Sequence, residues 1–328
     1  MNSFGTIFRV HIFGESHGDS IGVTIDGCPA GIDLTTQDFN SDLERRKPGK
    51  AGTTPRKEDD LPKIVSGVFQ DKTTGAPLTI IFQNNNTRSS DYEKLRDIPR
   101  PGHADFVLHQ KFKGCNDYRG GGHSSGRLTL ALVAAGVVAK KNLHALYPAA
   151  EVRATLTEAG GSSDIEAAIE QAIAAQDSIG GIVSCSVKAL PVGLGEPFFN
   201  SIESLISHAV FSIPAIKGIE FGSGFSAVKM TGSAHNDSIV DDKGTTATNN
   251  AGGINGGITN GNELIFRVAV KPTSSTPKEQ QSWNTASQQI ENFQVKGRHD
   301  LCIALRVPVV VEAVTAIVLA DLALQNKS

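Results

Sequence analysis

The 328-residue sequence has few of the residues that mark metal sites, disulfide scaffolds or nucleic-acid binding. It contains four cysteines, which lie far apart and form no CxxC pair: Cys28, Cys115, Cys185 and Cys302. Their spacing excludes a structural zinc site and a disulfide framework, and it predicts reduced, mostly buried thiols in a cytoplasmic protein that holds no metal. The net charge of −3 excludes a duplex-binding surface, so we expect no nucleic-acid partner.

The sequence also lacks a signal-peptide pattern and an uninterrupted apolar span. Residues 1–18 carry a single early positive charge and no long apolar core. The longest apolar run, residues 307–324, is interrupted by Glu312 and Asp321. This pattern favours a buried helix over a membrane span, and we expect no membrane partner.

Several catalytic motifs are missing from the sequence. The absence of GxxxxGK[ST] excludes a P-loop kinase, and the absence of GxGxxG after the first predicted strand excludes a simple dinucleotide-binding unit. HExxH is absent, and no GxSxG lies in a nucleophile-elbow context. Metalloproteases and α/β-hydrolases are therefore excluded as well.

Short predicted strands come in groups with helices between them, which favours an α+β fold with antiparallel sheets over a doubly wound sheet. No linker divides the chain, so residues 1–328 are expected to form one domain. Strands are predicted at 4–13, 21–27, 64–70, 77–82, 151–157, 181–189 and 264–271. A capping-box pattern at Thr35 and Asp38 predicts a helix at 37–46. Further helices are predicted after Ser125 and at 164–176, 202–211 and 309–324. Residues 273–295 are predicted to form a mobile excursion.

A glycine-rich loop at residues 118–127, YRGGGHSSGR, precedes the central predicted helix. Its three consecutive glycines allow the backbone to approach a ligand closely. Ser124 and Ser125 can cap the helix, whose N-terminus lies beside arginines and a histidine and is a natural anion site. A flexible loop that merely caps a buried helix explains this loop equally well.

Three other loops place a histidine beside glycine, arginine, serine or aspartate: GESHG at 14–18, RPGHAD at 100–105 and KGRHD at 296–300. His17 and His103 are candidate general acids, and Asp300 is a candidate base or a charge partner of Arg298. Taken singly, each is better explained as a loop histidine bonded to the backbone or as a structural Arg–Asp pair.

Further candidates surround these loops. Residues 271–275, KPTSS, offer a phosphate a cation, hydroxyls and free N–H groups, although an ordinary strand-ending turn explains them at least as well. The glycine- and asparagine-rich residues 250–257 are suited to a flat cofactor or to a surface loop. Arg45 and Arg46, which end the first predicted helix, are helix-dipole partners or anion ligands. These patterns together indicate an anion-binding enzyme that uses histidine acids.

Eight short motifs occur in the order found in chorismate synthases, and the sequence resembles that family from residue 3 to about residue 324. They are FGESHG (13–18), DLERRKPG (42–49), RPGHAD (100–105), YRGGGHSSGR (118–127), GLGEP (193–197), AGGINGG (251–257), KPTSS (271–275) and KGRHD (296–300).

The resemblance implies the last common step of the shikimate pathway towards the aromatic amino acids. In this step 5-enolpyruvylshikimate-3-phosphate loses phosphate and a C6 hydrogen by 1,4-anti elimination to give chorismate. The resemblance also implies reduced FMN, which is not consumed overall and lends an electron transiently, with NADPH as a possible reductant. A layered fold of antiparallel sheets around central helices is implied too, as is a homotetramer.

The resemblance further implies roles for individual residues. His17 would be an acid near the departing phosphate, His103 would protonate or steady the flavin, and Asp300 would help to remove the C6 proton, with Ser16 and Ser125 in support. Implied FMN contacts are His123, Ser124, Ser125, Pro214, Ala215, Gly256, Lys271, Pro272, Thr273, Ser274, Ser275 and Arg298. Implied substrate ligands are Arg45, Arg46, Arg100 and Arg127.

The sequence departs from the family pattern at Lys47, His123 and Gly126. Two other hypotheses remain open at this point. One is a flavoprotein oxidoreductase that consumes pyridine nucleotide, and the other is a non-catalytic anion-binding assembly protein. Stoichiometric consumption of reductant would mark the oxidoreductase, whereas the presence of His17, His103 and Asp300 disfavours a non-catalytic protein.

Overall fold

The structure, a computed structural model, describes residues 2–54, 59–85, 97–295 and 299–327. Its first sheet is built from five antiparallel strands in the order β1-β2-β3-β7-β4. These strands are β1 (Ser3–Phe4), β2 (Arg9–Gly14), β3 (Ser20–Asp26), β7 (Leu78–Gln83) and β4 (Lys63–Ser66). In β7 the residues Leu78, Ile80 and Phe82 are buried and alternate with less buried neighbours, as expected for a strand with one face in the core.

A second antiparallel sheet of four strands has the order β10-β13-β9-β8. Its strands are β10 (Ile216–Phe221), β13 (Leu264–Val270), β9 (Gly181–Lys188) and β8 (Glu151–Ala159). Alternate residues of β13, such as Phe266 and Val268, are fully buried. Each sheet therefore directs one apolar face towards a shared core.

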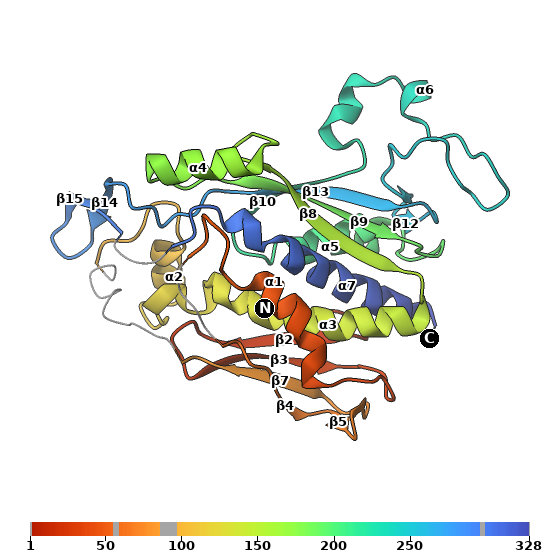
Figure 1. Ribbon diagram of the computed structural model, residues 1–328, viewed down its shortest axis with the longest axis horizontal. Helices are drawn as coiled ribbons and strands as arrows, with labels where there is room; N and C mark the ends of the chain where they lie inside the picture. The colour runs from red at the N-terminus through yellow and green to blue at the C-terminus, as the bar shows by residue number, and fades with distance from the viewer. Residues whose placement is uncertain (1, 55–58, 86–96, 296–298, 328) are drawn as a thin grey trace.

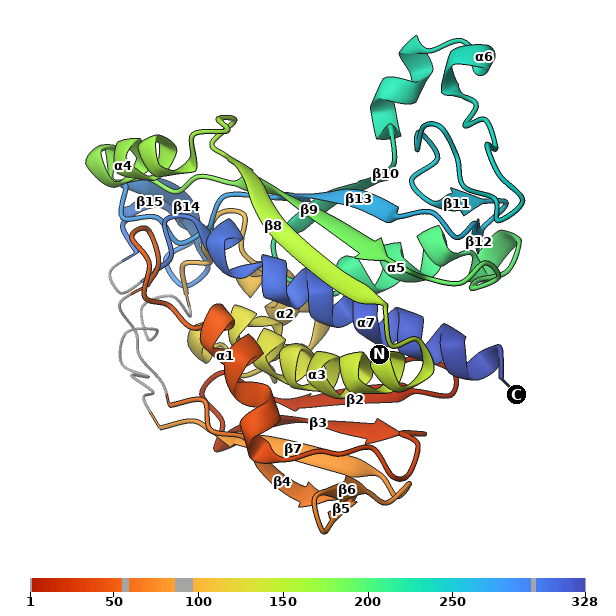
Figure 2. The same ribbon diagram turned by 45° about the vertical axis from the view of Figure 1, so that its right-hand side comes forward.

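The shared core is a layer of helices between the two sheets (Figures 1 and 2). It contains α1 (Asn40–Arg46), α3 (Thr129–Leu146), α5 (Ile202–Val210) and α7 (Pro308–Gln325). The helices α3 and α7 run side by side, and Gly136 of α3 packs directly on Ala313 of α7, where a β-carbon would overlap it. The absence of a side chain at Gly136 thus allows the two helices to approach each other closely.

Helix α7 is long and apolar enough to span a membrane by length and composition, but 83% of it is buried inside the protein. Its two acidic residues are both satisfied within the core. Glu312 accepts hydrogen bonds from Arg45, from Lys140 and from the backbone N–H of Ala154. Asp321 accepts from the backbone N–H groups of residues 6, 7 and 8. The acidic residues therefore tie α7 to both sheets and to α1.

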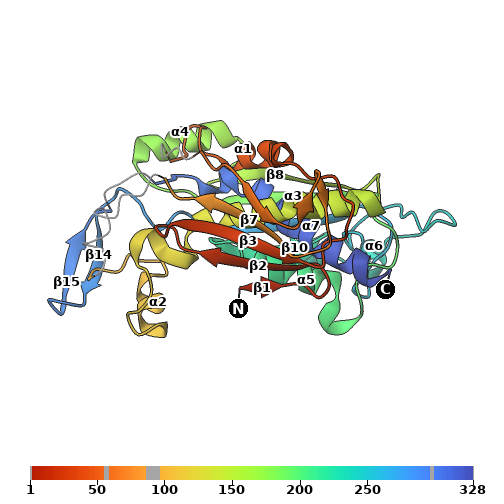
Figure 3. The same cartoon turned by 90° about the horizontal axis from the view of Figure 1, so that it is seen from below.

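The remaining elements lie around this sandwich. They are α2 (Asp105–Lys111), α4 (Ile165–Ala175), α6 (Gly232–His235), β5 (Val68–Phe69), β6 (Lys72–Thr73), β11 (Ile254–Asn255), β12 (Ile258–Thr259), β14 (Gln280–Asn284) and β15 (Gln289–Phe293). Figure 3 shows α2 and the β14–β15 hairpin at one end of the molecule and α6 at the other. The hairpin corrects one prediction: residues 280–293 form paired antiparallel strands within the segment expected to be a mobile excursion.

The predicted α+β class with antiparallel sheets is confirmed. The Thr35–Asp38 capping box is present and starts the helical segment that ends at Arg46. All four cysteines lie in the described part of the chain, where none forms a disulfide and only Cys115 is exposed. Helix α2 was not predicted, because its apolar residues Phe106, Val107 and Leu108 are consecutive rather than spaced with the period of a helix, and none of its residues is buried.

Candidate active site

A cavity of about 740 Å³ lies at one end of the helical layer. Its polar wall comes mainly from the glycine-rich loop before α3, the RPGHAD loop before α2, the segment after β13 and the segment before α7, and residues of β1, β2, α5 and α7 complete the lining. Leu128 and Val307, which immediately precede α3 and α7, both line it, so the N-termini of both core helices border the cavity. The two helices begin at the same end of the helical layer (Figure 1). Helix N-termini carry partial positive charge, and this arrangement favours anions.

The glycine loop joins two histidine-bearing loops. Gly120, Gly121 and Gly122 all have positive φ, at 59°, 83° and 53°. A β-carbon at Gly120 would lie 2.5 Å from the His17 ring, and one at Gly121 would lie 3.3 Å from the His103 ring. Glycine is therefore required here both for its backbone conformation and for the close approach of the two imidazoles.

Arg100, His103 and Asp105 form a compact hydrogen-bonded group. Arg100 donates from Nε and Nη2 to the two carboxylate oxygens of Asp105, at 2.7 and 2.8 Å. Nδ1 of His103 lies 2.6 Å from the same carboxylate. Burial raises the pKa of the Asp105 carboxyl, but the hydrogen bonds from Arg100 and His103 outweigh burial and hold that pKa well below its ordinary value. Asp105 is therefore ionised at neutral pH.

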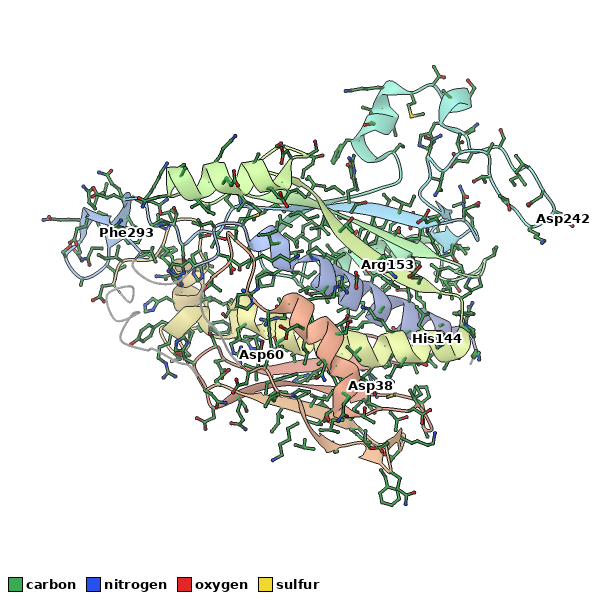
Figure 4. All side chains as sticks on the ribbon, viewed as in Figure 1. Asp38, Asp60, His144, Arg153, Asp242 and Phe293 are labelled. Atoms are coloured by element: carbon green, nitrogen blue, oxygen red, sulfur yellow. The ribbon has the colours of Figure 1, made fainter. Side chains whose placement is uncertain are left out.

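Asp60 bridges two buried arginines that reach the cavity from different elements. Its carboxylate lies 3.3 Å from Nη1 of Arg46 and 2.9 Å from Nη1 of Arg127. Burial, together with repulsion from Arg306 and Arg127, lowers the pKa of Arg46 to about 9, although Asp60 and Asp300 oppose the shift. Arg46 still carries its positive charge at neutral pH. Asp60 and His144 lie towards opposite ends of the helical layer (Figure 4).

Asp300 is buried and anchored on both carboxylate oxygens. Oδ1 accepts from the backbone N–H of Thr54 at 2.9 Å, and Oδ2 accepts from Nη1 of Arg306 at 3.0 Å. Arg306 also donates to the backbone carbonyl of Arg46 at 2.8 Å. Among the described residues, the charge partner of Asp300 is thus Arg306.

The segment after β13 packs on the RPGHAD loop. Lys271 donates to the Gly102 carbonyl at 2.7 Å and to the Ser274 hydroxyl at 2.6 Å. Ser275 accepts from Nη1 of Arg100 at 3.0 Å. Burial, and then the nearby charge of Lys217, lowers the pKa of Lys271. A lysine and two hydroxyls are thereby held beside the arginine of the neighbouring loop.

Comparisons with known proteins decide the family. A family model described as chorismate synthase matches residues 8–324. A chorismate synthase of Chitinophaga pinensis is 70% identical over 321 residues, covering 98% of this chain and 96% of the relative. The chain belongs to the chorismate synthase family. A chorismate synthase of Dehalococcoides mccartyi is 45% identical over 354 residues, with 99% and 97% covered.

The fold agrees with this membership. A solved structure described as chorismate synthase superposes with a TM-score of 0.76 at 26% identity, covering 98% of this chain and 93% of the other. As a chorismate synthase, the protein is a carbon–oxygen lyase that eliminates phosphate from 5-enolpyruvylshikimate-3-phosphate to form chorismate. A cavity rich in arginine suits a substrate that carries a phosphate and two carboxylates.

The structure brings most of the predicted chorismate synthase residues to one cavity. Those lining it are Ser16, Arg46, Arg100, His103, His123, Ser124, Ser125, Arg127, Pro214, Ala215, Lys271, Pro272, Thr273, Ser274 and Asp300. His17 is buried directly behind Gly120, and Ser275 is held by Arg100. Nδ1 of His123 donates to the Gly14 carbonyl at 2.7 Å, which orients its ring beside the loop that carries His17.

Two predicted residues, Arg45 and Gly256, lie away from the cavity lining. The guanidinium of Arg45 makes two 2.7 Å contacts with Glu312 inside the helical layer, and Arg45 is not among the cavity-lining residues. Gly256 lies in the turn between β11 and β12, away from the lining. Arg298 falls outside the described residues.

Sequence reasoning missed three charged residues of this site. Asp105 stands within the RPGHAD motif, and its spacing of two residues from His103 was the available signal. Asp60 and Arg306 stand in segments without a recognisable pattern. Asp60 pairs with Arg127, 67 positions away, and Arg306 donates to the backbone carbonyl of Arg46, 260 positions away, and no local feature indicates such contacts.

Proposed function

We propose that the cavity holds 5-enolpyruvylshikimate-3-phosphate and reduced FMN together, and that His17, His103 and Asp300 handle the protons of the elimination. The observation that carries this proposal is the charge of the cavity. Among the described residues, five lysine or arginine side chains line it but only two carboxylates. Its volume of about 740 Å³ falls within the roughly 300–1,000 Å³ typical of small-molecule sites.

Arg46, Arg100 and Arg127 are the proposed substrate ligands. All three are buried or nearly so, and each already donates to a carboxylate, which fixes its orientation before the substrate arrives. Guanidinium groups form paired hydrogen bonds with phosphate and carboxylate oxygens. Anionic groups of the substrate would therefore meet preoriented donors together with two helix N-termini.

The remaining lining residues fit FMN. One part of the wall is apolar and suits a flat ring, with Pro214, Ala215, Ile303, Val307 and Val310. Another part offers Lys271 and the hydroxyls of Ser124, Thr273 and Ser274 to a phosphate or ribityl chain. Bound reduced FMN would supply an electron-rich ring that assists loss of phosphate without net consumption.

The chain's own residues supply the acid–base chemistry. His17, buried beside Ser16 and the glycine loop, donates a proton to the departing phosphate. Asp300 is held by Thr54 and Arg306, and the remaining lone pairs of its carboxylate accept the C6 proton. His103 keeps a proton available beside the flavin. Burial of the surrounding ion pairs excludes water and strengthens each of these interactions.

We also propose a cytoplasmic homotetramer. Large apolar side chains are exposed on the chain, including Phe198 at 88%, Phe199 at 92% and Phe225 at 81%. Exposed apolar groups of this size favour contacts between subunits. Light scattering coupled to size-exclusion chromatography tests the assembly, and a monomer at micromolar concentration would reject it.

The activity is tested in an anaerobic assay with chemically reduced FMN. His17→Ala and His103→Ala should each lower kcat at least about tenfold, as expected for loss of a general acid. His144→Ala is the matched control, because this exposed histidine ends α3 away from the cavity. Wild-type rates in both active-site variants would reject the assignment. A parallel assay with oxidised FMN and NADPH tests whether the protein reduces its own flavin.

A further inference from the structure

We propose that Asp105 is a positioning residue for the reaction, which fixes the His103 ring in the tautomer that presents Nε2 to the cavity. This inference rests on the proposed role of His103. Asp105 is the first residue of α2, and its carboxylate is not part of the cavity wall. It therefore acts through His103 rather than on a ligand.

The Asp105 carboxylate is held firmly in place. It accepts from Nε and Nη2 of Arg100, and also from the backbone N–H of Arg100 at 3.2 Å. Arg100 is in turn fixed by the Ser275 hydroxyl at 3.0 Å. A carboxylate oriented by three donors provides a rigid reference point for the imidazole that lies against it.

The position of the proton on His103 follows from donor and acceptor chemistry. Nδ1 lies 2.6 Å from Asp105 Oδ1 and 3.0 Å from Arg100 Nη2. An ionised carboxylate only accepts hydrogen bonds, so the shorter contact requires a proton on Nδ1. Nη2 of Arg100 then donates to Asp105 at 2.8 Å rather than to the ring. Nε2 is consequently the ring nitrogen that gains or loses a proton.

The opposite edge of the ring faces the glycine loop at the cavity. A β-carbon at Gly121 would lie 3.3 Å from Cε1 and 3.4 Å from Nε2 of His103. Charged groups in contact with the ring are Asp105 and Arg100 from its own segment, and Lys271 binds the adjacent Gly102 carbonyl.

Asp105 should therefore orient the ring and keep the proton on Nδ1, so that Nε2 faces the cavity, as the aspartate of a catalytic triad does for its histidine. Asparagine in its place keeps the shape of the side chain but loses the charge, and its amide group can donate as well as accept. The tautomer of His103 would then no longer be fixed.

A double-mutant cycle tests this proposal. Asp105→Asn, His103→Ala and the double variant are compared for kcat and KM under anaerobic conditions with reduced FMN. If Asp105 acts through His103, Asp105→Asn lowers kcat at least about tenfold alone and less than about twofold in the His103→Ala background. Asp237→Asn is the control, because Asp237 also accepts several hydrogen bonds but none from the cavity wall.

The kinetic results of the cycle distinguish a failure of this inference from a failure of the proposed function. Equal losses of kcat in both backgrounds would overturn the inference, because Asp105 would then act through Arg100 or through general stability. An unchanged kcat in Asp105→Asn would also overturn it. An unchanged kcat in His103→Ala would instead reject the proposed role of His103. If Asp105→Asn does not fold, Asp105→Glu enters the same cycle with the same criteria, and ¹⁵N NMR of His103 reports its tautomer directly.

Discussion

The α-carbon of Gly120 approaches His17 so closely that a β-carbon on it would lie 2.5 Å from Cε1 of the imidazole. Gly120 also has a φ of 59°. This contact joins the connection between β2 and β3 to the loop before α3. The position of the buried histidine therefore depends on the absence of a side chain at residue 120.

Gly120→Ala should displace His17 and lower kcat at least about tenfold, the effect of losing a general acid. Gly161→Ala is the matched control: Gly161 also has positive φ, but a β-carbon there meets nothing within 4 Å. Both substitutions strain the backbone by about 1–3 kcal/mol, whereas only the first moves the histidine. Equal activity of the two variants would refute this account of the glycine loop.

Asp60→Asn should raise KM for the substrate at least about tenfold, because Arg46 and Arg127 lose the carboxylate that orients them. It should also reduce the free energy of unfolding by about 3 kcal/mol, because the buried positive charges of Arg46 and Arg127 lose the negative charge that neutralises them. Steady-state kinetics and urea denaturation measure the two effects. An unchanged KM in a folded variant would show that Asp60 does not organise the substrate arginines.

Glu312→Gln should destabilise the helical layer in a pH-dependent way. Burial raises the pKa of Glu312, but the hydrogen bond from Arg45 and the charge of Lys140 outweigh burial and leave this pKa below its ordinary value. The stabilisation is therefore present above the unfolded pKa of about 4.3, and it is lost as the pH falls through the lower folded pKa. Wild type and variant should differ by about 3 kcal/mol at pH 7 and converge in acid. A difference independent of pH would contradict the ion-pair explanation.

Gly136→Ala should destabilise the protein even though alanine is the better helix former. A β-carbon at residue 136 overlaps Ala313, and overpacking of this kind costs about 1–3 kcal/mol. Gly232→Ala, at a helical position where a β-carbon meets nothing within 4 Å, serves as the control. A Tm at or above that of the wild type for Gly136→Ala would show that α3 and α7 can separate without penalty.

Local patterns predicted much of the fold. Helix α7 was predicted because its apolar run is long, and the capping box at Thr35 marked the start of the helical segment before Arg46. The β14–β15 hairpin was not predicted, because its strands have no buried face and hence no apolar alternation. Strand order and the layering of the sheets depend on contacts between distant residues; the family resemblance supplied the layering, and no strand order was predicted.

In the candidate site, too, local motifs were predicted from the sequence and contacts between distant residues were not. Motif residues such as His103 and Lys271 were found from the sequence and do line the cavity. The bridge from Asp60 to Arg127 joins residues 67 positions apart, and it depends on the tertiary fold alone. Arg45 is the opposite case, a residue predicted from local sequence that has another role. Its adjacency to Arg46 predicted that both bind substrate, but the helix directs Arg45 to Glu312 and Arg46 to Asp60.

The most direct test of the central claim is the number of chorismate molecules formed per reduced FMN in an anaerobic assay of the purified protein. The account predicts many turnovers per flavin, with no net loss of reduced flavin and with phosphate released in equal amount. A single chorismate per flavin oxidised, or no chorismate at all, would contradict it.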